Sequence, residues 1–267
     1  MRVGRTEFIR DRDFFLEVSR GNIPDWQVYE QYAKNENTIN ATEVSLAAGG
    51  VINFLTAPDT VLVASGGNVN DTASGTGARK ILVQGVDENL KLASEIIELA
   101  GASASASTTT KFWRLFRAVV TESGTYTLTG AGTTGSNQGE IVVESTTDGT
   151  QLITIQQYES NSQYGCFSIP KGYVGHLSSL ILSVASNKSS VIRTYVRQNF
   201  TNTSTNIAAR SLALEFDGVS GVNYLTAKSS LVIPELSDIW FTAVAAANNT
   251  LVSINFEMLL EPINGKL

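Results

Sequence analysis

The stretch that decides the fold runs from Gly75 to Val143. It opens with GTGARKILVQGVDENLKLASEIIELAG (75–101), continues with TTTKFWRLFRAVVTESG (108–124) and closes with TTGSNQGEIVV (133–143). These are blocks of strand-forming residues joined by Gly, Ser and Thr. A short polar turn at 86–90 joins two strand-like runs, so we predict a hairpin over residues 79–99 whose arms of about ten residues reach roughly 30 Å.

The chain beyond residue 42 alternates apolar and polar side chains with a period of two. The clearest case is VSINFEMLL (252–260), in which every second side chain is apolar, as in a strand with one face on a core. No long helical pattern separates the strands, which argues against a parallel βαβ architecture. We therefore predict an all-β fold, an antiparallel β-sandwich or jelly roll, as one large unit or two in tandem.

Two apolar runs break this alternation. Residues 81–83 (ILV) and 180–182 (LIL) carry apolar side chains on both sides of the strand. We predict that these strands are covered twice, by the opposing sheet and by a second layer.

Residues 1–36 form a region of different character, because charges are dense there. DRDFFLEVSRG (11–21) has an acidic start, apolar residues spaced for one helical face and a glycine stop, which predicts a short helix. Pro24-Asp25 predicts a second helical stretch through Trp26, Tyr29 and Tyr32. This arm needs a surface to lie on, either its own subunit or a neighbour.

Three regions follow from these patterns. The first is the partly helical N-terminal arm at 1–36. The second is a first β-sandwich region at 37–160, and the third is a second β-sandwich or jelly-roll region at 161–267. The boundary lies where QQYESNSQ (156–163) is polar and lacks alternation.

The composition excludes several classes of protein. A formal net charge of −6 argues against a protein whose main task is to neutralise nucleic-acid phosphates. A single cysteine (Cys166) and a single histidine (His176) provide neither a disulfide framework nor the spacing of a transition-metal site. The sequence lacks a run of about 18 apolar residues and an apolar signal-peptide segment, so we expect no membrane association and synthesis in the cytosol.

Two segments superficially resemble ligand sites. GTGARK (75–80) has the glycines of a phosphate loop, but it leads into a strand and no GK[ST] follows, so we predict a loop feeding the hairpin. KFWRLFR (111–117) interleaves bases with aromatics, as in platforms for single-stranded nucleic acid. The same alternation fits a buried strand with Trp113 on one face, Phe112 and Phe116 on the other, and Arg side chains at the edges. The acidic balance favours this core interpretation, and a subunit interface is a third possibility.

Single residues suggest little chemistry. His176 could act as a base, but no nucleophile motif lies nearby, so we predict a locally bonded turn histidine. Cys166 is predicted to be a small buried residue. A carboxylate pair for glycoside hydrolysis has no sequence signature. The carboxylates available for such a pair are Asp148, Asp217, Asp238 and Glu257, for which turn and surface roles are predicted. We predict no catalytic, cofactor-binding or metal-binding residue and no enzyme activity.

Several blocks occur in order along about two thirds of the chain. They are FFLEVSRGNIP (14–24), GTGAR with VQGVD (75–79 and 83–87), FWR with RA (112–114 and 117–118), NQGEI (137–141) and IPKG (169–172). In order and spacing they resemble a family of virion structural proteins of tailed bacteriophages, especially marine and cyanobacterial ones. The segment 26–36 departs from that pattern, since relatives carry a more basic stretch there.

The resemblance implies a non-enzymatic capsid cement or decoration protein made in the host cytoplasm and placed on the capsid exterior. Such a protein binds the major capsid protein or other virion proteins and acts as a homo-oligomer, with a trimer expected. We also predict that residues 1–36 lie against a neighbouring subunit or the major capsid protein. The alternatives are a tail, fibre, vertex, penton or minor capsid component, or a carbohydrate-binding or depolymerising protein that uses exposed aromatics such as Trp113 or Trp240.

Overall fold

The computed structural model describes residues 14–125, 135–185, 187–203 and 208–263. Within these ranges there is one helix, α2 (Phe14–Ser19), and the rest of the regular structure is β-strand. The strands are β1 (Gln27–Thr38), β2 (Val44–Ser45), β3 (Val61–Val63), β4 (Ala78–Asp87), β5 (Leu92–Glu98), β6 (Phe112–Ser123), β7 (Ile141–Ser145), β8 (Gln151–Ile155), β9 (Cys166–Ser168), β10 (Tyr173–Val184), β11 (Ser190–Arg197), β12 (Ser211–Val219), β13 (Gly221–Ile233), β14 (Asp238–Ala245) and β15 (Thr250–Pro262).

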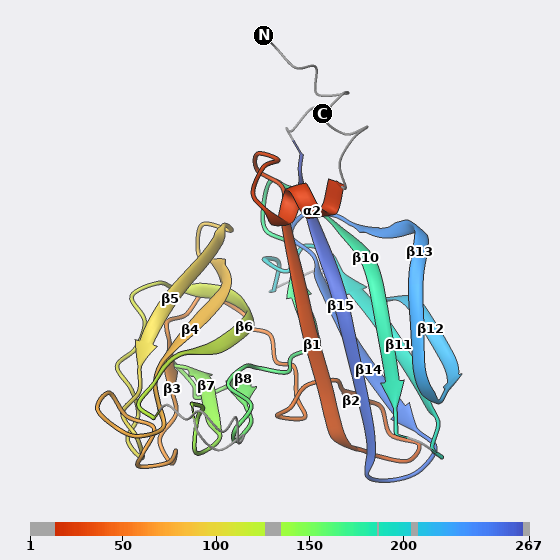
Figure 1. Cartoon of the computed structure of the whole chain (residues 1–267). Coiled ribbons are helices and arrows are strands. Elements are labelled where there is room, and N and C mark those ends of the chain that lie inside the picture. The colour runs from red at the N-terminus through yellow and green to blue at the C-terminus, as the bar shows by residue number, and fades with distance from the viewer. Residues whose placement is uncertain (1–13, 126–134, 186, 204–207, 264–267) are drawn as a thin grey trace.

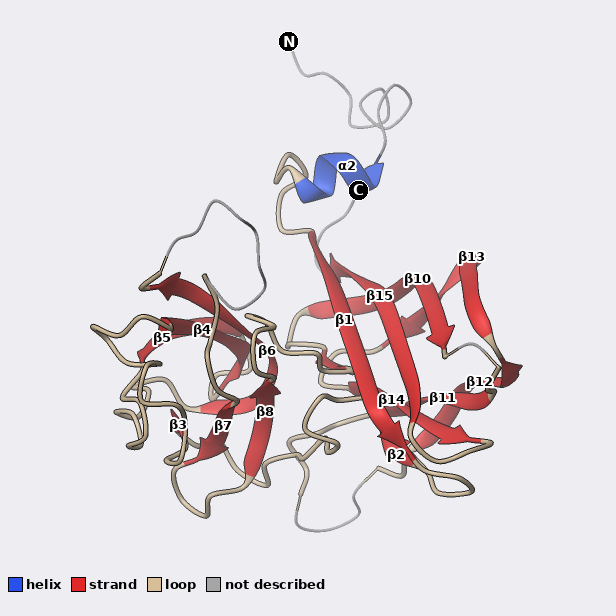
Figure 2. Ribbon diagram, turned by 60° about the horizontal axis from the view of Figure 1, so that its bottom comes forward, coloured by secondary structure: helices blue, strands red, loops and turns tan. Residues whose placement is uncertain are grey.

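The strands form four antiparallel sheets (Figure 1). Their orders are β1-β15-β10-β13, β12-β11-β14-β2 with β9 beside β14, β3-β7-β8, and β5-β4-β6. Figure 2 shows the first two sheets together on one side of the molecule and the last two on the other. The prediction of an all-β, antiparallel fold is confirmed. The more specific sandwich or jelly-roll class stays a prediction, because the strands divide into four separate sheets.

Two hydrophobic cores hold these sheets. The sheets that contain β15 and β14 share one core, in which the rings of Phe256 and Phe241 lie 4.9 Å apart. The predicted alternation of 252–260 is confirmed, since Ile254, Phe256 and Met258 are almost fully buried in this core. The second core joins the two smaller sheets and also contains Cys166 and Trp240.

The predicted hairpin over residues 79–99 is confirmed as β4 and β5, whose register pairs Lys80 with Glu98 and Val86 with Leu92. The glycine-rich segment before it is a loop that enters β4, as predicted. Gly85 lies inside β4 because the strand passes very close to β6. A Cβ atom at that position would lie 2.0 Å from the carbonyl oxygen of Arg114.

The N-terminal region differs from the prediction after residue 26. The predicted helix is confirmed as α2. Its residue Val18 packs with Ile23, Trp26 and Leu259 in a small apolar cluster. The predicted second helical stretch is wrong, because residues 27–38 form β1 and pair with β15 from Gln27↔Leu260 to Thr38↔Thr250. Residues 14–36 therefore lie on their own subunit, and residues 1–13 lie outside the described ranges.

The three predicted regions can be compared with the strands that each sheet contains. The two smaller sheets use strands between residues 61 and 155, and the predicted boundary at 160 falls between β8 and β9. The two larger sheets combine strands after residue 166 with β1 and β2. The division into 1–36, 37–160 and 161–267 stays a proposal.

Candidate functional site

The most distinctive surface is the outer side of the sheet β1-β15-β10-β13, which we call the outward face. Strand register places Tyr32, Asn255, Ile181 and Tyr224 in one row across all four strands. The neighbouring row contains Lys34, Ser253, Ser183 and Val222. We define the outward face by these two rows, which run roughly across the middle of the sheet.

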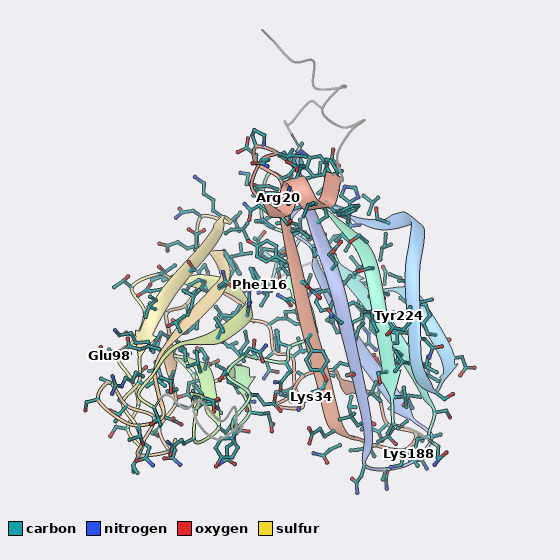
Figure 3. All side chains as sticks on the ribbon, in the orientation of Figure 1. Arg20, Lys34, Glu98, Phe116, Lys188 and Tyr224 are labelled. Carbon is teal, nitrogen blue, oxygen red and sulfur yellow. The ribbon has the colours of Figure 1, made fainter. Side chains whose placement is uncertain are left out.

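The outward face exposes large apolar side chains. Tyr224 is 74% exposed, Val222 57% and Tyr32 41%. In Figure 3, Tyr224 lies on the side of this sheet that faces the viewer, and no further sheet covers it there. The helix α2 covers one end of the same side through Leu259, which is buried in the small N-terminal cluster.

The predicted double covering of residues 180–182 is found on one side of the strand only. Leu180 and Leu182 are buried in the core between the two large sheets, whereas Ile181 points to the outward face and is half-buried. The described part of the chain supplies no second layer over the row of Ile181 and Tyr224. A sheet face that exposes several large apolar side chains and has no covering layer is a typical site of protein contact.

His176 lies on the same side of the sheet, nearer to α2. Its Nδ1 is 3.0 Å from Ser230 Oγ on β13, and its Nε2 is 2.8 Å from Glu261 Oε2 on β15. The prediction of a locally bonded turn histidine is wrong, because His176 sits within β10 and joins residues distant in sequence. The two contacts tie the edge strand β13 to the middle of the sheet.

A buried ion pair connects the smaller sheets to the larger ones. Arg114 on β6 is 3% exposed and Asp238 on β14 is fully buried. Arg114 Nε donates to Asp238 Oδ1 at 3.0 Å and Nη2 donates to Oδ2 at 3.1 Å. Arg197 and Ser168 also donate to this carboxylate, at 3.0 and 2.7 Å. The predictions of an edge position for Arg114 and a surface role for Asp238 are both wrong.

The aromatic residues around this pair form part of the packing. The guanidinium carbon of Arg114 lies 5.0 Å from the ring centroid of Phe54 and 4.7 Å from that of Phe200. Trp240 is 8% exposed and stacks on Tyr195. Phe112 and Phe116 are buried, which confirms the core interpretation of 111–117. Trp113 is half-buried, and its ring centroid lies 6.3 Å from that of Phe200. Neither of the two candidate tryptophans, Trp113 and Trp240, therefore stands as an open aromatic platform.

The remaining residues considered for chemistry have local roles. Cys166 is buried as predicted, and burial, followed by the negative charge of Asp238, raises the pKa of its thiol well above the usual value. Asp148 accepts a hydrogen bond from the amide of Thr150 at 2.9 Å, as expected of a turn residue. Asp217 lies in β12 at an irregularity of its pairing with β11, and Glu257 accepts a hydrogen bond from Ser178.

The ranges that the structure describes contain neither a metal-binding cluster nor a membrane-spanning helix. No cluster of three or more His, Cys, Asp or Glu side chains there could hold a metal ion. No described helix is long and apolar enough to span a membrane.

Comparison with known proteins adds little. No protein-family model matches the chain, and no curated protein matches it either. Among solved structures, it is similar to infectious bursal virus derived T=1 particles, with 9% identity over 89% of this chain and 70% of that chain and a TM-score of 0.27. It is also similar to the infectious bursal disease virus Gx strain, with 8% identity, 95% and 78% coverage and a TM-score of 0.28.

A third likeness is to vicilin from Corylus avellana (hazelnut), with 12% identity, 93% and 81% coverage and a TM-score of 0.15. All three TM-scores lie far below 0.5. These likenesses therefore carry no argument about the fold or function of this chain.

Proposed function

We propose that this chain is a non-enzymatic virion structural protein that acts as a capsid cement or decoration protein. In this role it binds the outer capsid and stabilises contacts between capsomers, as a homo-oligomer for which a trimer is expected. The proposal rests on the ordered sequence blocks that resemble virion structural proteins of tailed bacteriophages, on the all-β fold and on the outward face. It includes the sandwich or jelly-roll class and placement on the capsid exterior.

The outward face is the observation that carries the proposal. The whole outer side of this sheet, with four strands about 4.8 Å apart and about ten residues in each, has an area of roughly 600 Å². The two rows that define the outward face occupy less than half of it. A stable interface of standard size buries about 800 Å² on each partner, so the outward face forms the centre of such a contact and does not supply all of it. Lys34 is the one charged residue of the two rows, and its Nζ pairs with Glu36 and Glu159 at 2.9 and 2.8 Å. The other polar residues of the rows, Asn255, Ser253 and Ser183, carry no charge, which lowers the desolvation cost of a contact there.

The described part of the N-terminal region packs on its own sheet through α2 and β1. The expected contact of residues 1–36 with a neighbouring subunit or the major capsid protein stays a prediction. We base the cement role on the outward face, to which Tyr32 of β1 contributes.

The decisive experiment compares particles assembled with and without this protein by cryo-electron microscopy. Density missing across the whole capsid lattice, together with lower resistance to heat or osmotic shock, is the expected result. Density missing at the tail or at a unique vertex alone would contradict the cement role and favour an appendage, penton or minor capsid component. Loss of this density when Tyr224→Lys replaces the wild type would show that the protein needs the outward face to occupy the lattice.

A further inference from the structure

A polar groove of about 630 Å³ lies at one end of the sheet β3-β7-β8. Because β7 runs antiparallel to both neighbours, the ends of β3 and β8 meet the start of β7 at that end. The groove lies between residues 64–68, which follow β3, residues 138–142 and residues 156–157, which follow β8. Its volume is in the range of small-molecule sites, about 300 to 1,000 Å³.

The lining of this groove is rich in side-chain amides. Asn68, Gln138, Gln156 and Gln157 line it together with backbone from three glycines. Glu140 is the one charged side chain among the described residues that line it. A lining without Lys, Arg or His does not suit phosphate or nucleic acid, and the scarcity of apolar side chains does not suit an apolar ligand.

Internal hydrogen bonds fix the amides before any ligand arrives. Gln157 Nε2 donates to the carbonyl oxygen of Gln138 at 2.7 Å, and Gln156 Nε2 donates to that of Ala48 at 2.9 Å. Each bond uses one of the two N–H donors of its amide group. A fixed array of groups that both donate and accept matches a ligand that does the same, such as a row of hydroxyl groups.

A buried carboxylate holds one wall of the groove. Asp71 is 3% exposed and accepts hydrogen bonds from the backbone amides of Gln138 and Gly139, both at 2.8 Å. Gly139 allows the two walls to approach, because a Cβ atom there would lie 2.6 Å from Asn68 Cβ. Hydrogen bonds and close packing within the loops therefore fix the shape of the groove.

An exposed aromatic ring follows the groove in the chain. Tyr158 comes directly after Gln157, is 42% exposed and has a φ of 67°, a left-handed conformation that is unusual for a bulky residue. Its backbone amide donates to Asn137 O at 3.0 Å, which fixes Tyr158 beside the wall that carries Gln138. The turn therefore holds Tyr158 next to the groove, just outside its lining, at a partly exposed position.

We propose that this groove binds a short, neutral oligosaccharide. Gln138 Nε2 donates to Thr76 Oγ1 at 3.2 Å, and its Oε1 accepts from Asn70 Nδ2 at 2.9 Å, which leaves one N–H donor of this amide for a ligand. The remaining N–H donors of Gln138 and Gln157 would bond sugar hydroxyls, and the ring of Tyr158 would pack against the apolar face of a sugar ring. This binding site is separate from the outward face and does not depend on the virion role.

The test uses the full chain and a printed array of neutral oligosaccharides, including oligomers of glucose, galactose and mannose, followed by titration calorimetry with the best ligand. Tyr158→Gly removes the ring and suits the left-handed backbone, so the fold is retained. We expect about a tenfold loss of affinity for it and a similar loss for Gln157→Ala. Glu88→Gln, in the turn at the far end of β4, is the control and should bind as the wild type does.

Binding that Tyr158→Phe keeps and Tyr158→Gly loses, at unchanged melting temperature, supports the site. An array without any bound neutral sugar would overturn the proposal. So would sugar binding that neither Tyr158→Gly nor Gln157→Ala weakens, or displacement of the sugar by an uncharged Gly/Asn/Ser peptide at equal concentration.

Discussion

At the scale of single residues, the thiol of Cys166 is a reactive group that the fold shields from solvent. It is 1% exposed, and burial raises its pKa well above the usual value. The thiolate is the reactive form of cysteine, so a neutral and buried thiol reacts slowly.

We predict that the native protein reacts with less than one equivalent of Ellman's reagent over hours at pH 8. The same protein in guanidinium chloride should release one equivalent within minutes, since unfolding exposes the thiol. Rapid labelling of one thiol under native conditions, with unchanged circular dichroism, would contradict the burial of Cys166.

The carboxylate of Glu95 makes stability depend on pH. Burial acts to raise its pKa, but hydrogen bonds from the amides and hydroxyls of Thr109 and Thr110 outweigh burial and lower the pKa below 4.5. A carboxylate with a lowered pKa in the folded state stabilises it above the unfolded-state pKa. That contribution is lost as the pH falls through the folded-state pKa.

We therefore predict that the free energy of unfolding decreases as the pH falls below about 4.5, and that Glu95→Gln flattens part of this decrease. Urea unfolding at a series of pH values measures it. Glu88→Gln, an exposed turn residue, is the matched control and should leave the profile unchanged. A Glu95→Gln profile parallel to that of the wild type would contradict the assignment.

At the scale of elements, one ion pair joins β6 of a small sheet to β14 of a large sheet. Breaking such a buried pair from one side leaves an uncompensated charge, which costs about 3–5 kcal/mol. We predict a loss of this size in the free energy of unfolding for Asp238→Asn, because Arg114 and Arg197 both lose their charged partner.

Asp217→Asn provides the matched control for Asp238→Asn. Asp217 is exposed on β12, and surface substitutions of this kind usually change stability by within about 0.5 kcal/mol. Equal losses for the two variants, measured by urea unfolding, would show that the β6–β14 pair does not support the contact between the sheets.

The element β1 shows where sequence patterns are ambiguous. Trp26, Tyr29 and Tyr32 are spaced by three residues, which suits one face of a helix as well as an irregular strand. In the structure, Tyr29 packs against Phe116 and Phe167, while Tyr32 lies on the outward face. Only pairing with β15, more than 200 residues away, selects the strand, and a local pattern contains no information about it.

At the scale of the whole molecule, the outward face predicts the oligomeric state. A lysine at position 224 places a charge in the row of Tyr32 and Ile181 on an edge strand, and such charges oppose association. We predict that the wild type is an oligomer by sedimentation velocity and that Tyr224→Lys shifts it toward monomer.

Ile96→Lys is the control for Tyr224→Lys. Ile96 is 56% exposed on the edge strand β5 of a different sheet. If Ile96→Lys dissociates the oligomer and Tyr224→Lys does not, the contact lies on the smaller sheets and the outward face is not the interface between copies.

Local patterns predicted much of the fold but little of the site. The hairpin of β4 and β5, the alternation in β15, the helix α2 and the burial of Cys166 all follow from periods and turn residues within a short window. The pairing of Arg114 with Asp238, the contacts of His176 and the groove beside Gln138 join residues far apart in sequence. The aromatic neighbours of Arg114 in the sequence are one signal that this arginine is buried. Its partner, Asp238, could not be inferred without the order of the strands in the sheets.

The central position of β15 in its sheet has a consequence for the order of events during synthesis. β1 emerges from the ribosome early, yet its partner strand begins at Thr250. The sheet can therefore close only when nearly all of the 267 residues have been made, whereas the strands of the smaller sheets are available by residue 155. The row of Tyr32, Asn255, Ile181 and Tyr224 exists only after that closure, so a nascent or prematurely terminated chain cannot dock through it.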